Sequence, residues 1–181
     1  MAANVSIEWF WIRINPDDTW SITEEKLVNA GVDLRKLPRS VYVIRAANSF
    51  SIRYPKRHSP TLYIGEGKFK QRISLHRKWL SKIHALTGAF PLDVAICTPR
   101  VTNNTKAHQE FEAHLLNVFF KNYGSLPLKN KIHENNKFHH KYDKSSVTDV
   151  IGPGKGKRYK WAIEPLKSNP FHKHFIKTHG A

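Results

Sequence analysis

Val41-Tyr42-Val43-Ile44 and Leu62-Tyr63-Ile64-Gly65 are the two stretches of the chain that decide its fold. Both are rich in β-branched and aromatic residues, which favour strands, and the simplest arrangement pairs them antiparallel. Such a pair brings Tyr42 and Tyr63 onto neighbouring strands. Two strand tyrosines by themselves are explained by ordinary packing, so a functional role for them depends on residues further along the chain.

A helix is predicted directly after the second strand, from about Lys68 to Leu86. Arg72 and His76 are four residues apart in it and therefore lie on one face, one turn apart. An arginine can hold a phosphate through its planar guanidinium group, and a histidine can transfer protons near neutral pH. The alternative is a solvated basic helix face, which the spacing alone favours because several lysines share the helix.

The rest of the core follows in the order strand, helix. Residues 92–98 are apolar after Asp93, which is typical of a central strand, and Asn104 or Thr105 caps a helix that Gly124 ends. The order strand, strand, helix, strand, helix predicts an α+β fold. We expect a small antiparallel or mixed three-stranded sheet flanked by helices.

Three segments are expected from changes in composition. Residues 1–40 form an N-terminal accessory extension, with a strand in 8–14 and a helix that opens at 23–25. Residues 41–131 form the core, in which a long polar and basic connection joins the first two strands. Residues 132–181 form a basic C-terminal extension that is expected to contact a polyanion.

The net charge of +16 is unevenly distributed. Residues 1–40 carry five Lys or Arg against six acids, whereas residues 41–181 carry 25 against eight. A polyanion is the expected partner, because neutralised phosphates release counterions; solubility or an acidic protein partner would explain the same charge. The nucleic-acid-binding candidates lie in the basic loops and at the start of the first core helix: Arg53, Lys56, Arg57, Lys68, Lys155, Lys157 and Arg158.

Cys97 is the only cysteine, which excludes an internal disulfide and a zinc site built of cysteines. The chain shows no signal peptide and no apolar run long enough to span a membrane. A reducing, cytoplasmic location is therefore expected.

Glu110 and Glu112 are the carboxylates of the second core helix, and only one should face a site. Glu112 lies beside the apolar stripe that contains Phe111 and Leu115, whereas Glu110 is expected to point further out. Two interpretations of Glu112 then have similar weight. It is a ligand for Mg²⁺, which prefers oxygen donors, or it pairs with a lysine or arginine.

Taken together, residues 41–131 resemble the GIY-YIG nuclease domain. Val41-Tyr42-Val43 stands for the first triplet, Tyr63-Ile64-Gly65 for the second, and residues 127–131 look like its closing stretch. The chain departs from the family in having Val for both Gly and Ile of the first triplet, and in the twenty residues between the two tyrosines. The resemblance implies a catalytic set of Tyr42, Tyr63, Arg72, His76, Glu112 and Asn130, with Asn122, Asn135 and Asn136 competing for the asparagine role.

The resemblance also implies a mechanism. Glu112 would hold one Mg²⁺ ion, for which Mn²⁺ can substitute, and Arg72 would stabilise the scissile phosphate. Tyr42 is expected to be the general base with His76 as its proton acceptor, although His76 is the easier base by its ordinary pKa. Tyr63 orients the water or the phosphate.

The predicted function is a metal-dependent DNA endonuclease that acts on double-stranded DNA. A type II restriction-like enzyme working as a homodimer is the leading subtype, because two-fold symmetry suits cleavage of both strands of a symmetric site. The alternatives are a non-catalytic nucleic-acid-binding protein on the same scaffold and a structure-specific repair or recombination nuclease.

Overall fold

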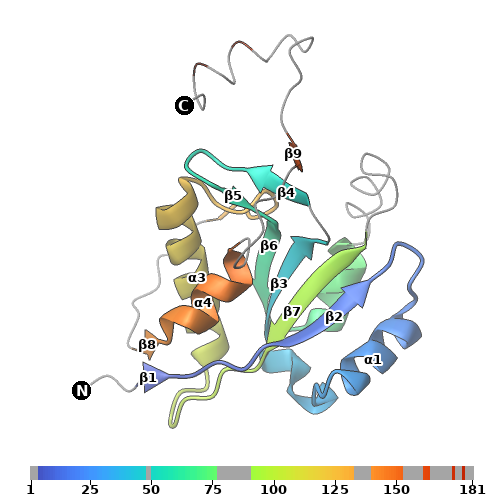
Figure 1. Ribbon diagram of the computed structural model, residues 1–181. Helices are drawn as coiled ribbons and strands as arrows, with labels where there is room; N and C mark the ends of the chain where they lie inside the picture. Colours follow the sequence, from blue (N-terminus) through green and yellow to red (C-terminus); the bar gives the residue numbers. More distant parts are fainter. Residues whose placement is uncertain are drawn as a thin grey trace.

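The computed structural model (Figure 1) describes residues 4–47, 50–76, 91–132, 140–152 and 161–163, together with Lys173 and Lys177. Its centre is a four-stranded antiparallel sheet in the order β2-β7-β3-β6. These strands are β2 (Phe10–Ile14), β3 (Val41–Ala46), β6 (Thr61–Glu66) and β7 (Leu92–Cys97). The expected α+β architecture, a mostly antiparallel sheet flanked by helices, is confirmed.

The middle of the sheet is formed by β3 and β7, which are apolar along almost their whole length. In β3 the first five residues are all buried, and Val41 pairs with Glu66 on one side and Cys97 on the other. The predicted antiparallel pairing of the first two core strands and the central place of residues 92–97 are both confirmed. Strands covered on both faces carry continuous apolar runs, which is why the sequence identifies them.

The prediction of a three-stranded sheet was wrong, because β2 adds a fourth strand beside β7. In β2 the side chains alternate: Ile12 and Ile14 are buried, while Trp11 and Arg13 point outwards. The near-neutral charge of residues 1–40 made them look separate from the core. Charge, however, says nothing about where an apolar strand face is buried.

Helices cover both sides of the sheet. The helix α1 (Trp20–Asn29) begins earlier than predicted, because the Thr19 hydroxyl caps it by accepting from the Ile22 N–H group. A 3₁₀ helix, η1 (Leu34–Arg39), leads into β3. The helix that follows β6 begins at Phe69 and is described as far as residue 76; the rest of the predicted helix, to Leu86, lies outside the described residues.

The longest described helix is α3 (Ala107–Tyr123), which ends at Gly124 as predicted. Gly124 has a φ of 80°, a left-handed conformation that glycine adopts without strain. In Figure 1, α3 lies on the side of the sheet where β6 is the edge strand, whereas α1 lies near β2. Among the described helices, none is long and apolar enough to cross a membrane.

The long connection between β3 and β6 is not a simple loop. It contains β4 (Phe50–Arg53) and β5 (His58–Ser59), which pair antiparallel, and β9 (Trp161–Ile163) joins β4 in parallel. Tyr54, between β4 and β5, packs against Phe119 with ring centroids 4.9 Å apart. The connection therefore has a buried aromatic contact of its own with α3.

Part of the C-terminal region also packs into the domain. Strand β8 (Lys141–Tyr142) pairs in parallel with β1 (Asn4–Val5), and α4 (Lys144–Ile151) buries Val147, Val150 and Ile151. The sequence predicted a polar and basic tail here, and this helix was not predicted because its apolar face consists of only three residues.

Arg45 connects the sheet to α4. Its guanidinium group donates to the carbonyl oxygens of Asp149 at 3.1 Å, Val150 at 3.0 Å and Gly152 at 3.0 Å, and it lies 5.1 Å from the centre of the Trp11 ring. A buried cation is stable only when its donors are satisfied, and carbonyls at a helix C-terminus are suitable acceptors. Arg45 thus holds α4 against β3.

Replacing Arg45 by methionine should lower the free energy of unfolding by about 3 kcal/mol, because the carbonyls of α4 lose their buried donor. Urea denaturation of both proteins measures this. The control is Arg13→Met, which removes an exposed pair with Asp93 (Nε–Oδ1 2.8 Å) and should cost below about 1 kcal/mol. Equal losses in the two variants would show that Arg45 does not anchor α4.

Candidate functional site

The two tyrosines lie on one face of the sheet. Tyr42 pairs with Gly65, so Tyr63 is diagonal to Tyr42 on the neighbouring strand, and their ring centroids are 6.0 Å apart. Gly65 makes this arrangement possible. A Cβ atom there would lie 2.5 Å from Tyr63 Cε1 and 2.8 Å from the Tyr42 hydroxyl oxygen, so a side chain at this position would force the rings to move.

His76 joins the tyrosines from the helix above this face. Its Nε2 atom lies 3.4 Å from the Tyr42 hydroxyl oxygen, and its ring centroid is 4.3 Å from that of Tyr63. Phe69, at the start of the same helix, meets the Tyr42 ring edge-on at 5.1 Å. The packing of Phe69 and the buried Ile73 against the sheet thus sets where His76 points.

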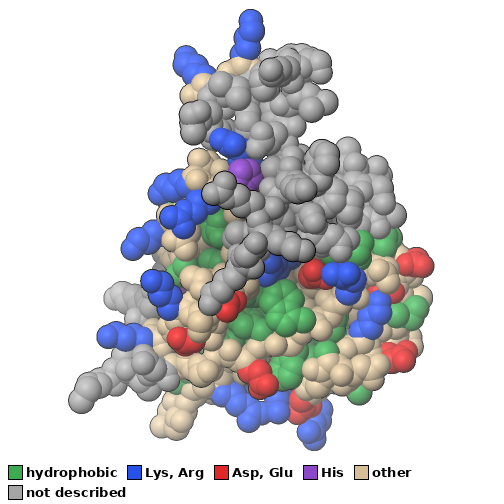
Figure 2. Space-filling view, viewed as in Figure 1, with side chains coloured by type: hydrophobic (Ala, Val, Ile, Leu, Met, Phe, Trp, Pro, Cys, Tyr) green, Lys and Arg blue, Asp and Glu red, His purple; other side chains and the backbone are tan. Residues whose placement is uncertain are grey.

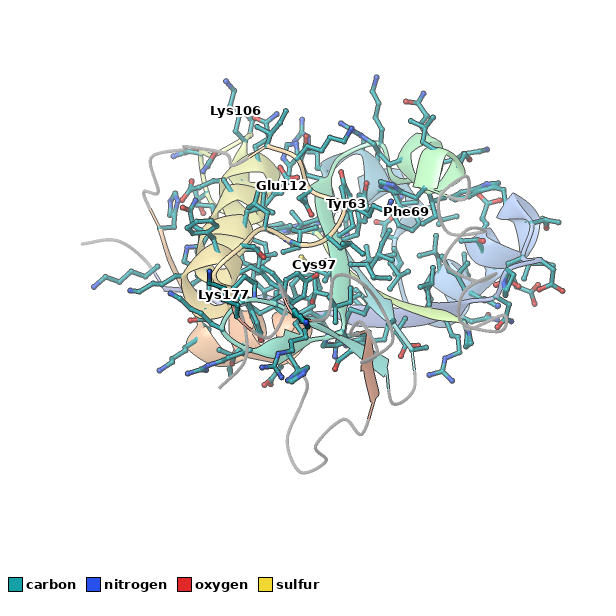
Figure 3. The ribbon with its side chains drawn as sticks, turned by 90° about the horizontal axis from the view of Figure 1, so that it is seen from above. Tyr63, Phe69, Cys97, Lys106, Glu112 and Lys177 are labelled. Carbon is teal, nitrogen blue, oxygen red and sulfur yellow. The ribbon has the colours of Figure 1, made fainter. Side chains whose placement is uncertain are left out.

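Arg72 and Glu112 bring opposite charges to the tyrosines. Arg72 lowers and Glu112 raises the pKa of both Tyr42 and Tyr63, so both charges act on this spot. Figure 3 shows Tyr63 on β6 between Glu112 on α3 and Phe69. The five side chains come from four elements, β3, β6, the helix after β6 and α3, and the fold brings them together.

The five side chains of the site differ in their exposure to solvent. Arg72 is exposed, Tyr63 and Glu112 are half-buried, and Tyr42 and His76 are buried. A ligand arriving from solvent therefore meets the guanidinium, the carboxylate and the Tyr63 side chain before the inner pair.

Burial sets the protonation states of the inner pair. It raises the pKa of Tyr42 well above its ordinary value, and Tyr63 raises it further, so Tyr42 carries its proton at neutral pH. Burial, together with the Arg72 charge, lowers the pKa of His76 to about 4, so His76 is neutral. A neutral imidazole beside a protonated hydroxyl can accept a proton from it.

Asn130 lies along the open edge of β6, which is the edge that does not pair with β3. Its Oδ1 atom accepts from the Ile64 N–H at 2.9 Å, and its Nδ2 group donates to the Ile64 carbonyl at 2.8 Å. The amide thus acts as a one-residue strand partner next to Tyr63. Of the competing asparagines, Asn122 is half-buried near the end of α3, and Asn135 and Asn136 lie outside the described residues.

The expectation that Glu110 points outwards was wrong. Glu110 is buried, accepts from the Asn104 side chain at 3.0 Å and from the His140 N–H at 3.0 Å, and lies 2.9 Å from His140 Nδ1. Its position three residues after the buried Ala107 places it on the inner face of α3. That spacing was the signal in the sequence for its burial.

The basic candidates fall into two described places. Arg53 ends β4, Lys56 and Arg57 form its turn to β5, and Lys68 is exposed just before the helix that carries Arg72. The Lys56 backbone N–H donates to the Tyr123 carbonyl at 3.1 Å, which holds this turn against the C-terminal end of α3. The remaining candidates, Lys155, Lys157 and Arg158, lie outside the described residues.

A carboxylate at the tyrosines is compatible with Mg²⁺, which prefers oxygen ligands. Within the described ranges, no three or more His, Cys, Asp or Glu side chains are grouped so as to hold a metal ion. Mg²⁺ needs no such cage, since it is usually held by one or two carboxylates, waters and substrate phosphate. Glu112 beside Tyr63 supplies a carboxylate of that kind.

Comparisons of the chain with protein-family models, with curated proteins and with solved structures find no match.

The lowered pKa of His76 predicts a pH dependence of stability. The unfolded chain binds a proton at His76 near pH 6.5 but the folded protein only near pH 4, so stability should fall as the pH drops through this window. Urea denaturation should show wild-type protein losing about 2 kcal/mol more than His76→Gln between pH 6.5 and 4, allowing for partial solvent screening. Parallel curves would mean that His76 titrates normally.

Gly65→Ala should displace the rings of both tyrosines and cost about 1 to 3 kcal/mol of stability, because the added methyl group overpacks the site. Near-ultraviolet circular dichroism measures the change in aromatic packing. Gly65→Ala combined with Tyr63→Leu, which removes the closest ring, should recover part of the stability. No recovery would place the strain elsewhere.

Proposed function

We propose that the chain is a metal-dependent endonuclease of the GIY-YIG type that hydrolyses phosphodiester bonds in double-stranded DNA. The observation that supports this most is the convergence of Tyr42, Tyr63, Arg72, His76 and Glu112 on one spot. These five residues carry the resemblance in the sequence. They lie up to 70 positions apart in the chain, and packing alone does not require a cation and a carboxylate beside two tyrosines.

In this proposal Arg72 receives the scissile phosphate. It is the most exposed of the five side chains, and its planar fork matches two phosphoryl oxygens. A guanidinium held at this place stabilises the negative charge that develops on those oxygens in the transition state.

The general base is the Tyr42–His76 pair acting as a unit. A free tyrosinate at Tyr42 is costly, because burial opposes the charge. If the Tyr42 hydroxyl passes its proton to neutral His76 as it takes one from water, no free tyrosinate forms. Tyr63, which is half-buried and touches the His76 ring, orients that water.

Glu112 would hold the metal ion, and Asn130 keeps Tyr63 in place. Mg²⁺, or Mn²⁺ in its stead, would supply positive charge near the phosphoryl oxygens and the leaving oxygen. Asn130 acts through the backbone of Ile64 and is therefore a positioning residue.

The proposal includes the restriction-like subtype and the homodimer. The β4–β5 hairpin, β2 and α4 surround the three core strands with more surface than hydrolysis needs. The net charge of +16 on a chain of 181 residues suits contact with a long polyanion. Two copies related by two-fold symmetry would cut both strands of a symmetric site.

Incubation with long mixed-sequence DNA and Mg²⁺ tests the proposal. Wild-type protein should yield discrete fragments on a gel, and Glu112→Gln should cut about 100-fold more slowly or worse while still binding DNA, because the metal loses its carboxylate. Gln109→Ala, an exposed change on the same helix, is the control and should cut normally.

A smear in place of bands would support nuclease activity but exclude the site-specific subtype. Binding without any cleavage over a range of Mg²⁺ and Mn²⁺, on linear and on branched substrates, would leave a non-catalytic binder. Full activity of Glu112→Gln would exclude Glu112 as the metal ligand.

A further inference from the structure

A basic cleft of about 690 Å³ lies at the end of the sheet where β3 begins. Its walls are η1, the segment after β7 and the first turn of α3. Arg35, Lys36, Arg39 and Arg100 line it together with His108, and none of the described residues that line it is acidic. None of the five tyrosine-site side chains lines it, so this is a separate feature.

The charge of the cleft is only partly neutralised. Asp33, the N-cap residue of η1, pairs with Arg35 (Nε–Oδ1 3.0 Å) and with Lys36 (Nζ–Oδ2 3.0 Å). Arg39 and Arg100 are exposed and make no ion pair within the described part of the chain. Four Lys and Arg side chains face two carboxylates, Asp33 and the Glu66 that contacts His108, and this excess of positive charge favours an anion. Figure 2 shows Lys and Arg side chains along the lower edge of the molecule, where η1 lies in Figure 1.

The wall formed by the segment before α3 is held in shape by the buried carboxylate of Glu110. Asn104, which lines the cleft, donates from its side chain to Glu110 at 3.0 Å and accepts from the Lys106 N–H at 2.9 Å. Its neighbour Asn103 has a φ of 62°, a left-handed turn that asparagine tolerates. The cleft is therefore preorganised, which reduces the ordering cost of binding.

The cleft adjoins the tyrosine site. Val41 lies in register with Glu66 and Cys97 across the sheet, and the next residue of β3 is Tyr42. His108, in the cleft, contacts Glu66 with Nε2–Oε2 3.4 Å. Arg39 is three residues from Tyr42, so their Cα atoms are at most roughly 11 Å apart. One DNA strand advances about 3.4 Å along the helix axis for each nucleotide, so this distance corresponds to about three nucleotides.

We propose that this cleft binds a backbone phosphate of the nucleic-acid strand whose scissile phosphate lies at Arg72, a few nucleotides away. This inference rests on the proposed function and extends it to residues of the N-terminal segment that the sequence placed outside the DNA-binding set. Arg39 and Arg100 contact the phosphate, and Arg35 and Lys36 add to the field. The first two residues of α3, Ala107 and His108, line the same cleft, and a helix N-terminus favours negative charge.

The test is the binding of a short mixed-sequence duplex in EDTA, where no cleavage occurs, measured by fluorescence anisotropy at several salt concentrations. The double variant Arg39→Ala/Arg100→Ala should bind about tenfold more weakly, and its salt dependence should fall by about one counterion for each phosphate that the variant no longer neutralises. The matched control is Arg13→Ala/Lys121→Ala, which removes the same charge from exposed positions outside the cleft lining and should lose little affinity.

Equal losses of affinity in the two double variants, or none in the first, would overturn the inference. Inorganic phosphate distinguishes a strand from a free anion: it should displace the duplex from wild-type protein no better than chloride at equal ionic strength. Displacement at micromolar phosphate would reassign the cleft to the free anion. If wild-type protein cleaves DNA but the cleft variant binds the duplex normally, only this inference is wrong. If the cleft variant binds more weakly but wild-type protein does not cleave DNA, only the proposed nuclease activity is wrong.

Discussion

The antiparallel register of β3 with β6, which puts Tyr42 opposite Gly65, is the constraint on which the site depends. A slip of one residue would turn Tyr63 to the other face of the sheet, away from His76. The absence of a side chain at Gly65 lets the Tyr42 and Tyr63 rings lie 6.0 Å apart. Asn130 closes the open edge of β6 beside Tyr63 and so supports the same register.

The protonation states at the site depend on how deeply this register buries each group. The inner pair is desolvated, which keeps Tyr42 protonated and His76 neutral, while Arg72 stays in solvent. Glu110 is buried, and its hydrogen bonds hold the segment before α3. Glu112 lies on the same helix but is half-buried and acts on the tyrosines.

The core strands could be predicted because fully buried strands leave continuous apolar runs in the sequence, as in Val41–Ala46 and Leu92–Cys97. The strand β2 was expected, but its place in the sheet was not. Alternation of apolar and polar residues identifies a strand but does not say which strand it pairs with. The hairpin β4–β5 and helix α4 were missed. Their apolar patterns are short, and the residues that bury them come from other parts of the chain, as Phe119 does for Tyr54.

By itself the sequence determined the strand tyrosines, the shared face of Arg72 and His76, and the excess of positive charge, because these depend on composition and on local helix and strand geometry. Only the tertiary structure decided that Glu110 accepts a hydrogen bond from His140, that Glu112 acts on the tyrosines, and that Arg39 and Arg100 line one cleft. Contacts between residues distant in the chain arise from packing, and no local period in the sequence encodes them.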